Sequence, residues 1–313
     1  MKKNILISSD TQNLQPSNRQ NCIKTILLTG ATGYLGGFLS DKFLSKGYNI
    51  IALCLNYKED FKCKQEYEKQ VKRYFLDKTE LETIFKENNI DIVIHTATLY
   101  GRNKESLSTM LEANVIFPVK VLTLASKYKV KMFVNTDTIL IKNINAYSLT
   151  KNQFVDWLAI FTNDIMCVNM KLDHFYGPND KPIKFVAWLI QQLKNNVEKI
   201  DLTEGSQTRD FIYVDDVVNA YLCVIENYHK LVIGKLNQFE VGTGVRISIK
   251  DFVITVKEEL HNIKTKLNFG AVPYRKNEVL EYSVDNSALK FLGWEPTIFV
   301  KEGIKKILEI EGI

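Results

Sequence analysis

Residues 25–37 read Thr-Ile-Leu-Leu-Thr-Gly-Ala-Thr-Gly-Tyr-Leu-Gly-Gly. A short apolar run leads into glycines at positions 30, 33 and 36, and a helical pattern of apolar residues follows them. This order predicts a strand, a tight turn and a helix. Glycines let the backbone N–H groups of such a turn approach a pyrophosphate, which then lies at the positive end of the helix dipole. The stretch therefore indicates a dinucleotide site rather than a plain glycine-rich turn.

Strand-like and helix-like segments alternate from residue 48 to residue 172. Strands are expected at 48–55, 73–76, 90–97, 131–135 and 165–172, and helices at 79–88, 107–128 and 146–161. The strands are nearly continuous apolar runs, which is typical of a parallel sheet with helices on both faces. The fold class is therefore α/β, with a Rossmann-type doubly wound parallel sheet. Pro118 is expected to kink the long helix.

The pattern changes after residue 172. Helices are expected at 185–195, 217–226, 248–260 and 301–309, with extended segments at 210–214, 235–242, 266–269 and 281–285. We divide the chain into a polar N-terminal arm (1–21), a dinucleotide-binding domain (22–172) and a smaller mixed α/β domain (173–313) that mainly binds substrate. Residues 210–245 are expected to return to the Rossmann sheet.

Length and composition limit the kinds of protein that this chain can be. With 313 residues, 45% of them hydrophobic, the chain can bury a large core. The net charge of +5 comes from interspersed basic and acidic residues, so neither a nucleic acid nor a membrane is expected as a partner. The five cysteines form no CxxC pair and no cluster with histidine, which predicts no metal site and a cytoplasmic protein with reduced thiols. No apolar run is long enough to span a bilayer.

One pair of residues has the spacing of an acid/base site. Tyr147 and Lys151 lie four residues apart, so on a helix they share a face. A lysine ammonium beside a phenol is expected to lower the tyrosine pKa. The alternative is an ordinary solvated helix face. The position favours chemistry, because the preceding strand ends in the hydroxyl-bearing stretch Asn-Thr-Asp-Thr at 135–138, at the ligand edge of such a sheet.

The sequence resembles the extended short-chain dehydrogenase/reductase family, which contains nucleotide-sugar epimerases, dehydratases and 4-ketoreductases. The resemblance runs from about residue 24 to residue 310. Besides the glycine turn and the Tyr-x-x-x-Lys pair, it rests on Val-Ile-His-Thr-Ala (93–97), Asn-Val (114–115), Phe-Tyr-Gly-Pro (175–178), Arg-Asp-Phe-Ile-Tyr-Val-Asp-Asp-Val (209–217), Phe-Glu-Val-Gly-Thr-Gly (239–244) and Leu-Gly-Trp (292–294).

A narrower resemblance is to the CDP-paratose and CDP-abequose synthases, which reduce a CDP-4-keto-3,6-dideoxyhexose. It rests on Leu-Tyr-Gly-Arg (99–102), Leu-Asp-His-Phe-Tyr-Gly (172–177), Gln-Thr-Arg-Asp-Phe (207–211) and Asn-Phe-Gly-Ala-Val (268–272). By resemblance, Tyr147 is the general acid/base, and Lys151 is its electrostatic partner and the ribose anchor. Thr136 or Thr138 is the residue that hydrogen-bonds the C4 oxygen of the sugar.

The resemblance also implies binding residues. The cofactor set is Gly30, Thr32, Gly33, Tyr34, Leu35, Gly36, Asn56, Lys58, Asp77, Ala97, Asn114 and Lys151. Asp77 matches an adenine contact, and the alternative is an N-cap of the next helix. The second strand ends without the acid that chelates the ribose of NAD, and Asn56 and Lys58 could receive a 2′-phosphate. The cofactor expected is NADPH, with NAD(H) as the alternative.

The substrate set is Tyr100, Arg102, His174, Gln207, Arg209 and Arg275. Gln207 and Arg209 match residues near the nucleotide diphosphate, and Arg275 matches a second phosphate clamp whose alternative is a surface arginine. His174 stands where the family usually has asparagine. It is interpreted either as a substrate contact or as a buried, hydrogen-bonded histidine.

One departure from the family pattern reduces the number of candidate reactions. Dehydratases carry an Asp-Glu pair after the active-site threonine, whereas Asp137 is followed here by Thr138, so the base for the C5 proton is absent. The sequence therefore predicts a nucleotide-sugar 4-ketoreductase, in the biosynthesis of cell-surface deoxysugars. The alternatives are a 4-epimerase with retained NAD and a non-catalytic cofactor-sensing protein on the same fold.

The sequence also predicts a homodimer. The helices at 107–128 and 146–161 are apolar on more than one face, with Met110 and Leu124 on the first and Val155 and Trp157 on the second lying off the main stripe. In this family the two helices commonly pair with their copies across a two-fold axis. The alternative is that residues 1–21 of the same chain cover them.

Overall fold

The computed structural model describes residues 24–56, 61, 63–275, 278–281 and 283–313. The predicted arm at 1–21 and the predicted cofactor residue Lys58 lie outside these ranges.

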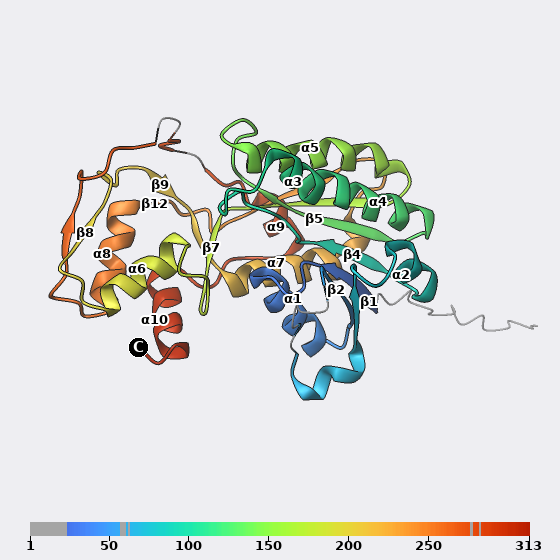
Figure 1. Ribbon diagram of the computed structural model, residues 1–313, viewed down its shortest axis with the longest axis horizontal. Coiled ribbons are helices and arrows are strands. Elements are labelled where there is room, and N and C mark those ends of the chain that lie inside the picture. The colour runs from blue at the N-terminus through green and yellow to red at the C-terminus, as the bar shows by residue number, and fades with distance from the viewer. Residues whose placement is uncertain (1–23, 57–60, 62, 276–277, 282) are drawn as a thin grey trace, which may run out of the picture.

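A seven-stranded sheet forms the centre of the larger part of the molecule (Figure 1). All neighbouring strands are parallel, and their order is β11-β6-β5-β4-β1-β2-β3. The strands are β1 Thr25–Thr29, β2 Asn49–Cys54, β3 Val71–Phe75, β4 Ile92–His95, β5 Met132–Thr138, β6 Met166–Leu172 and β11 Asn237–Val241. The chain winds outward in one direction from β1 and in the other from β4. A crevice for ligands is expected at that switch point, beyond the carboxyl ends of the two strands.

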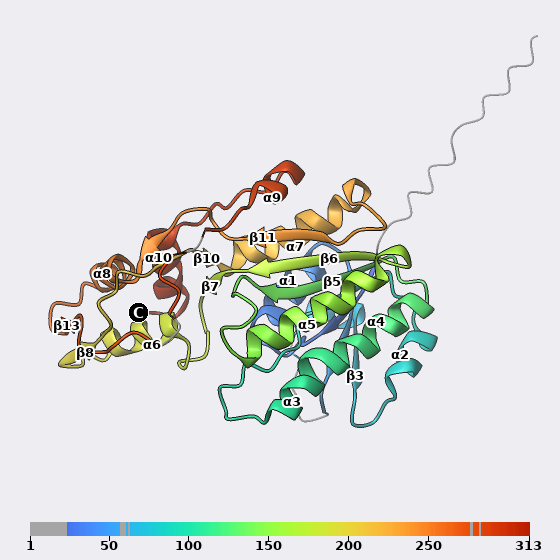
Figure 2. The same ribbon diagram turned by 90° about the horizontal axis from the view of Figure 1, so that it is seen from above.

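Helices cover both faces of the sheet, which confirms the predicted α/β class. Alternate residues of one strand point to opposite layers, so Leu28 packs with α1 and α7, whereas Leu27 packs with α2, α4 and α5. Figure 2 shows the two layers edge-on. The helices are α1 Tyr34–Ser45 and α7 Val214–Glu226 on one face, and α2 Leu81–Glu87, α4 Phe117–Lys127 and α5 Ala146–Ile160 on the other.

The predicted long helix is continuous but changes its winding. It consists of α3 Leu107–Leu111, a π-helical turn η2 Glu112–Ile116, and α4. The distortion predicted at Pro118 therefore lies one turn earlier, because Pro118 has no N–H to bond the carbonyl four residues back, at Asn114. By length and hydropathy, residues 107–127 also suffice to cross a bilayer, contrary to the sequence expectation. Here Val121, Leu122 and Ala125 pack into the core.

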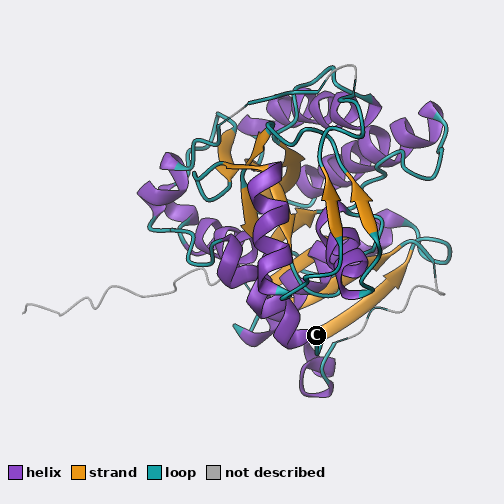
Figure 3. Ribbon diagram, turned by 90° about the vertical axis from the view of Figure 1, so that its left-hand side faces the viewer, coloured by secondary structure: helices purple, strands orange, loops and turns teal. Residues whose placement is uncertain are grey.

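The second part of the chain builds a smaller lobe, seen end-on in Figure 3. It contains α6 Phe185–Lys194, α8 Ile249–Glu259 and α10 Val300–Ile310. Three short strand pairs accompany them: β7 His174–Tyr176 with β10 Phe211–Tyr213, β8 Lys199–Asp201 with β13 Lys266–Asn268, and β9 Thr208–Arg209 with β12 Ile247–Ser248. The chain returns to the large sheet with α7 and β11, and α9 Ser287–Leu292 packs beside β11.

The remaining differences from the expected elements are small. The segment at 281–285 contains no strand among its described residues, and α9 was not predicted. Three 3₁₀ turns complete the described structure: η1 Gln65–Gln70, η3 Phe161–Asn163 and η4 Tyr228–Lys230. These pieces are too short to carry a hydrophobic period that a sequence could reveal.

Alanine substitutions in the glycine turn test whether the close approach of α1 to β1 stabilises the fold. A Cβ on Gly36 would lie 2.1 Å from the carbonyl oxygen of Gly30, whereas a Cβ on Gly37 would meet nothing within 4 Å. Gly36→Ala should therefore lower the free energy of unfolding by about 1–3 kcal/mol or more. Gly37→Ala, the matched control, should raise it by about 0.5–1 kcal/mol because alanine favours a helix interior. Denaturant titration measures both, and equal stability of the two variants would contradict the packing argument.

Candidate active site

The glycine turn joins β1 to α1 and lies against the end of β4. Gly30 has φ +70°, and a Cβ there would lie 2.7 Å from the backbone nitrogen of Ala97. Gly33 donates its N–H to the carbonyl of Gly30 at 2.9 Å, and no side chain caps the start of α1. Thr32 and Gly33 are exposed, whereas Leu35 is buried. The exposed backbone at the start of α1 therefore fits a pyrophosphate.

Tyr34, the first residue of α1, ties the turn to the second part of the chain. Its ring stacks on Phe175 with the centroids 6.2 Å apart, and the Lys184 ammonium lies 4.8 Å from the ring centroid. Burial raises the pKa of Tyr34, so its hydroxyl stays protonated. Lys184 had not been singled out from the sequence.

Two predicted cofactor residues follow the ends of outer strands. Asn56 lies two residues beyond β2 and is half-buried. Asp77 lies two residues beyond β3 and is exposed. The residue at the N-cap of α2 is Glu80, so the alternative role of Asp77 as a helix cap is wrong.

Asn114 lies in the π-helical turn and is fully buried. Its side-chain oxygen accepts from Thr98 Oγ1 and from the backbone N–H of Leu99, at 3.1 and 2.8 Å. Its side-chain nitrogen donates to the carbonyl of Leu99 and to Thr150 Oγ1, at 2.8 and 3.0 Å. The amide therefore holds the loop after β4 against α5, beside Lys151. The cofactor contact predicted for Asn114 stays a prediction.

Tyr147 lies in the first turn of α5, and its ring is part of an aromatic stack. Asn145 caps the helix by accepting from the backbone N–H of Ser148 at 2.8 Å. The Tyr147 ring stacks on Tyr100 with the centroids 4.8 Å apart, and the Arg102 guanidinium lies 5.2 Å from the Tyr100 centroid. The structure thus brings together one predicted catalytic residue and two predicted substrate residues.

The electrostatics of Tyr147 differ from the sequence expectation. Burial raises the pKa of its phenol well above the ordinary value, and Tyr100 and Asp137 add to this, while Arg102 opposes it. The expected lowering by Lys151 does not prevail, because a buried phenolate loses its hydration. Tyr147 is therefore a protonated acid at neutral pH.

Lys151 follows one turn after Tyr147 and is only 2% exposed. Burial lowers the pKa of its ammonium to about 8, and the nearby carboxylate of Asp137 works in the opposite direction. Asp137 Oδ2 accepts from Asn169 Nδ2 at 3.0 Å, and Asn169 Oδ1 accepts from Asn135 Nδ2 at 2.8 Å. This buried chain of side chains keeps a negative charge near Lys151, and the sequence motifs gave no sign of it.

The two candidate threonines lie on the same face of β5 but make different bonds. Thr136 Oγ1 is 2.7 Å from the hydroxyl of Tyr221 in α7. Thr138 is buried, and its Oγ1 accepts from the backbone N–H of Leu140 at 3.3 Å in the turn after the strand. Thr136 is the more open of the two. The geometry therefore favours Thr136 as the residue that faces a ligand.

The residues predicted for the diphosphate form a second group. Arg209 is buried, pairs with Glu278 at 2.5 Å, and donates to the carbonyl of Thr208 at 2.7 Å. Gln207 is buried and donates to Thr203 Oγ1 at 3.1 Å. Arg275 is exposed, and its carbonyl accepts from the N–H of Glu278. The structure thus joins Arg209 to the loop that carries Arg275 through Glu278.

The structure excludes one of the two predicted roles of His174, and the substrate contact stays a prediction. Its side chain is 40% exposed, which excludes the fully buried histidine. Its Nδ1 lies 2.5 Å from a carboxylate oxygen of Asp173, and its ring meets Phe211 edge-on. One imidazole edge is therefore held by a carboxylate while the ring remains accessible.

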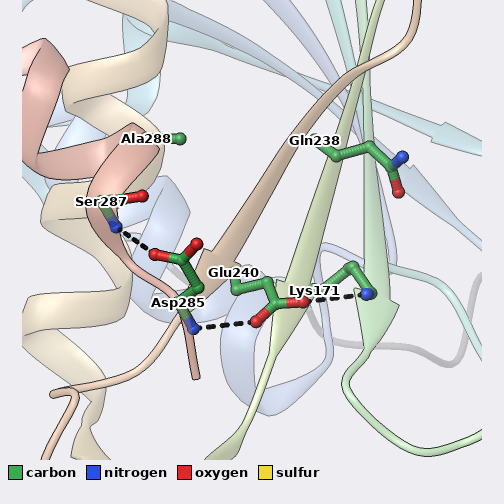
Figure 4. A pocket seen from close by; sticks show the side chains of 6 residues that line it. All are labelled: Lys171, Gln238, Glu240, Asp285, Ser287 and Ala288. Atoms are coloured by element: carbon green, nitrogen blue, oxygen red, sulfur yellow. Dashed lines mark hydrogen bonds and ion pairs between the residues drawn. The ribbon is translucent and has the colours of Figure 1, made fainter. Parts of the chain in front are cut away.

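Two surface pockets have linings that do not include the predicted site residues. Figure 4 shows the first, beside β6, β11 and α9, where Lys171 pairs with Glu240, and Glu240 accepts from the backbone of Asp285. The second lies between α8 and α10. Neither pocket is lined by a predicted site residue, and in the first the charged groups already bind one another. Among the described residues no cluster has the composition of a metal site.

Comparisons with known proteins agree with this picture. Residues 26–242 match the family described as NAD dependent epimerase/dehydratase. Over 298 residues, the chain is 35% identical to CDP-abequose synthase of Salmonella muenchen, covering 92% of this chain and 98% of that protein.

Two solved structures share the fold. One is UDP-glucose 4-epimerase of Thermotoga maritima with UDP-glucose, with a TM-score of 0.77 and 24% identity over 92% of this chain and 98% of that one. The other is UDP-glucuronic acid 4-epimerase of Bacillus cereus with UDP-glucuronic acid and NAD, with a TM-score of 0.77 and 22% identity over 91% and 99%. At these identities the likeness concerns the fold alone.

The charge of Lys151 can be measured without any substrate. Carbon-13 NMR of lysine-labelled protein should show one ammonium that titrates near pH 8, far below the ordinary lysine value of about 10.4. Lys151→Arg assigns the signal by removing it. Asp137→Asn should lower the midpoint further, because the carboxylate favours the charged form. A Lys151 midpoint near 10.4 would contradict the burial of this group.

Proposed function

Because the chain belongs to the NAD-dependent epimerase/dehydratase family, we propose that it reduces the C4 ketone of a nucleotide-linked 6-deoxy or 3,6-dideoxy sugar. The family makes the chain an oxidoreductase or epimerase. The finer proposal is a CDP-sugar substrate, NADPH as reductant, and a place in the synthesis of cell-surface polysaccharide sugars. Its support is the identity to a CDP-abequose synthase over nearly the whole length of both proteins.

The main support for the proposal is the buried, protonated phenol of Tyr147 with Lys151 one turn away. A ketone reductase needs a protonated acid beside the carbonyl oxygen, and burial keeps the Tyr147 phenol protonated at neutral pH. Lys151, one turn away and buried, keeps a positive charge below pH 8 or so. The exposed backbone at Thr32 and Gly33 suits the pyrophosphate of a dinucleotide, and the turn packs so tightly that a Cβ on Gly30 would lie 2.7 Å from the backbone nitrogen of Ala97.

When bound, NADPH would supply the hydride that reduces the C4 carbon. Tyr147 gives its proton to the C4 oxygen, and Thr136 donates a hydrogen bond to the same oxygen as negative charge develops there. Lys151 holds a ribose hydroxyl, and its positive charge stabilises the Tyr147 phenolate that the proton transfer leaves behind. Tyr100 and Arg102 lie over the acid and orient the sugar. Gln207, Arg209, Arg275 and His174 are proposed to hold the nucleotide diphosphate and the adjoining sugar.

Three alternatives are less well supported. Dehydration requires a base for the C5 proton, and position 138 holds a buried threonine hydroxyl. An epimerase with retained NAD usually has an acid after the second strand, and Asn56 is there instead. A cofactor-sensing protein has no use for the Tyr147/Lys151 pair. Epimerisation remains the second candidate, because the family to which the chain belongs includes epimerases.

We also propose a cytoplasmic homodimer that binds neither nucleic acid nor a membrane. Its contact surface is the apolar outer side of α3, η2 and α5. Trp157 is 48% exposed and Ile160 65% exposed, although Met110, expected to need a partner, is buried within its own chain. Leu124 likewise packs on the core. The exposed apolar residues of this surface are Leu107, Leu111, Ile116, Leu149, Trp157 and Ile160.

The reductase proposal is tested with purified protein, NADPH and a panel of nucleotide 4-keto sugars, following the loss of cofactor absorbance. We expect turnover with a CDP-4-keto-3,6-dideoxy sugar and a higher kcat/KM with NADPH than with NADH. Tyr147→Phe should lower kcat by ~10²–10⁴-fold while NADPH still binds, because it removes only the acid. Tyr128→Phe, which removes a hydroxyl that bonds Glu82 on the outer layer, is the control. Wild-type turnover by folded Tyr147→Phe would refute this role.

The dimer is tested by light scattering. The 36.1 kDa chain should give a mass of about twice that value, and Trp157→Glu should give a monomer, because a carboxylate cannot be buried unpaired in an apolar contact. Phe291→Glu, on exposed α9, is the control and should remain dimeric. A monomeric full-length protein that self-associates only after removal of residues 1–21 would show that the arm covers this surface instead.

A further inference from the structure

The hydroxyl of Thr136 has a partner from the layer opposite the acid. Tyr221 lies in α7, is fully buried, and places its hydroxyl oxygen 2.7 Å from Thr136 Oγ1. Tyr147 comes from α5, on the other face of the sheet. Burial raises the pKa of Tyr221, and Asp137 and Tyr100 add to this. Helices from both layers thus meet at the end of β5.

This hydrogen bond has a direction that can be deduced. Each hydroxyl has one proton, and among the described residues Thr136 Oγ1 is the only hydrogen-bond partner of the Tyr221 hydroxyl. If Thr136 donated, the proton of Tyr221 would be buried without an acceptor, which is unfavourable. Burial also keeps that phenol protonated. Tyr221 therefore donates to Thr136, and the proton of Thr136 is left for another acceptor.

We propose that Tyr221 is a positioning residue for the reduction, which fixes the Thr136 hydroxyl so that its proton points to the C4 oxygen of the sugar. The inference rests on the proposed function, since it requires a C4 oxygen beside Thr136. A hydrogen bond that is donated to this oxygen strengthens as negative charge develops on it. The contribution of Tyr221 is therefore made mainly in the transition state, and it acts through Thr136 without touching the sugar.

Removal of one hydroxyl tests the inference. Tyr221→Phe should lower kcat roughly three- to tenfold, the loss that one misdirected neutral hydrogen bond produces, with little change in KM or in NADPH affinity. Tyr176→Phe is the matched control, because Tyr176 is also buried and its hydroxyl bonds only the distant carbonyl of Val300 among the described residues. A fall in kcat of the same size in both variants, or no fall in Tyr221→Phe, would overturn the proposal.

A double-mutant cycle separates action through Thr136 from independent action. Thr136→Val removes the hydroxyl that Tyr221 is proposed to orient. In that background Tyr221→Phe should have no further effect on kcat, because the two residues act as one unit. Independent effects that multiply would overturn the proposal while leaving the assigned reaction intact.

A measurement that needs no turnover keeps the two questions apart. In threonine methyl-labelled protein, the Thr136 signal, identified by its loss in Thr136→Val, should report one side-chain rotamer in wild type and in Tyr176→Phe. In Tyr221→Phe it should report averaging between rotamers. A Thr136 rotamer that is unaffected by Tyr221→Phe would overturn the positioning role. Failure of every 4-keto sugar as a substrate would instead refute the proposed function.

Discussion

The absence of a side chain at position 36 is the constraint on which the rest of the structure depends. A Cβ there would lie 2.1 Å from the Gly30 carbonyl oxygen, so α1 can start directly behind β1 only with glycine. That close approach leaves the backbone of the turn open beside the end of β4, at the point where the strand order of the sheet reverses. The position of the dinucleotide site follows from packing between one helix and one strand.

In the proposed reaction centre, burial determines the protonation of Tyr147 and Lys151. Taking Tyr147 and Lys151 out of water raises the pKa of the phenol and lowers that of the ammonium, so both groups shift toward their neutral forms. The Asn135–Asn169–Asp137 chain partly offsets this for Lys151 by keeping a carboxylate nearby. The proposed acid is therefore protonated because burial of its phenol disfavours the phenolate. From the other layer, Tyr221 of α7 places its hydroxyl 2.7 Å from Thr136 Oγ1.

Much of the fold could be predicted from the sequence, because long apolar runs and helical periods report burial directly. The seven-stranded sheet, the glycine turn and the helix bearing Tyr147 and Lys151 follow from such local patterns. The Thr136–Tyr221 bond could not be predicted, since 85 residues separate its partners and either residue alone is an ordinary core polar group. The burial of Met110 could not be predicted from the helical period, because the loop at Gly101 lies against its side chain.

Hydride transfer to the sugar is the central claim, and deuterium tests it most directly. The purified protein is incubated with NADPH carrying deuterium at the transferable position of the nicotinamide, together with a CDP-4-keto-3,6-dideoxy sugar. The account predicts one deuterium at C4 of the sugar product for each NADPH oxidised, with loss of this label transfer in Tyr147→Phe. A product without deuterium at C4, or interconversion of C4 epimers with no net consumption of NADPH, would contradict it.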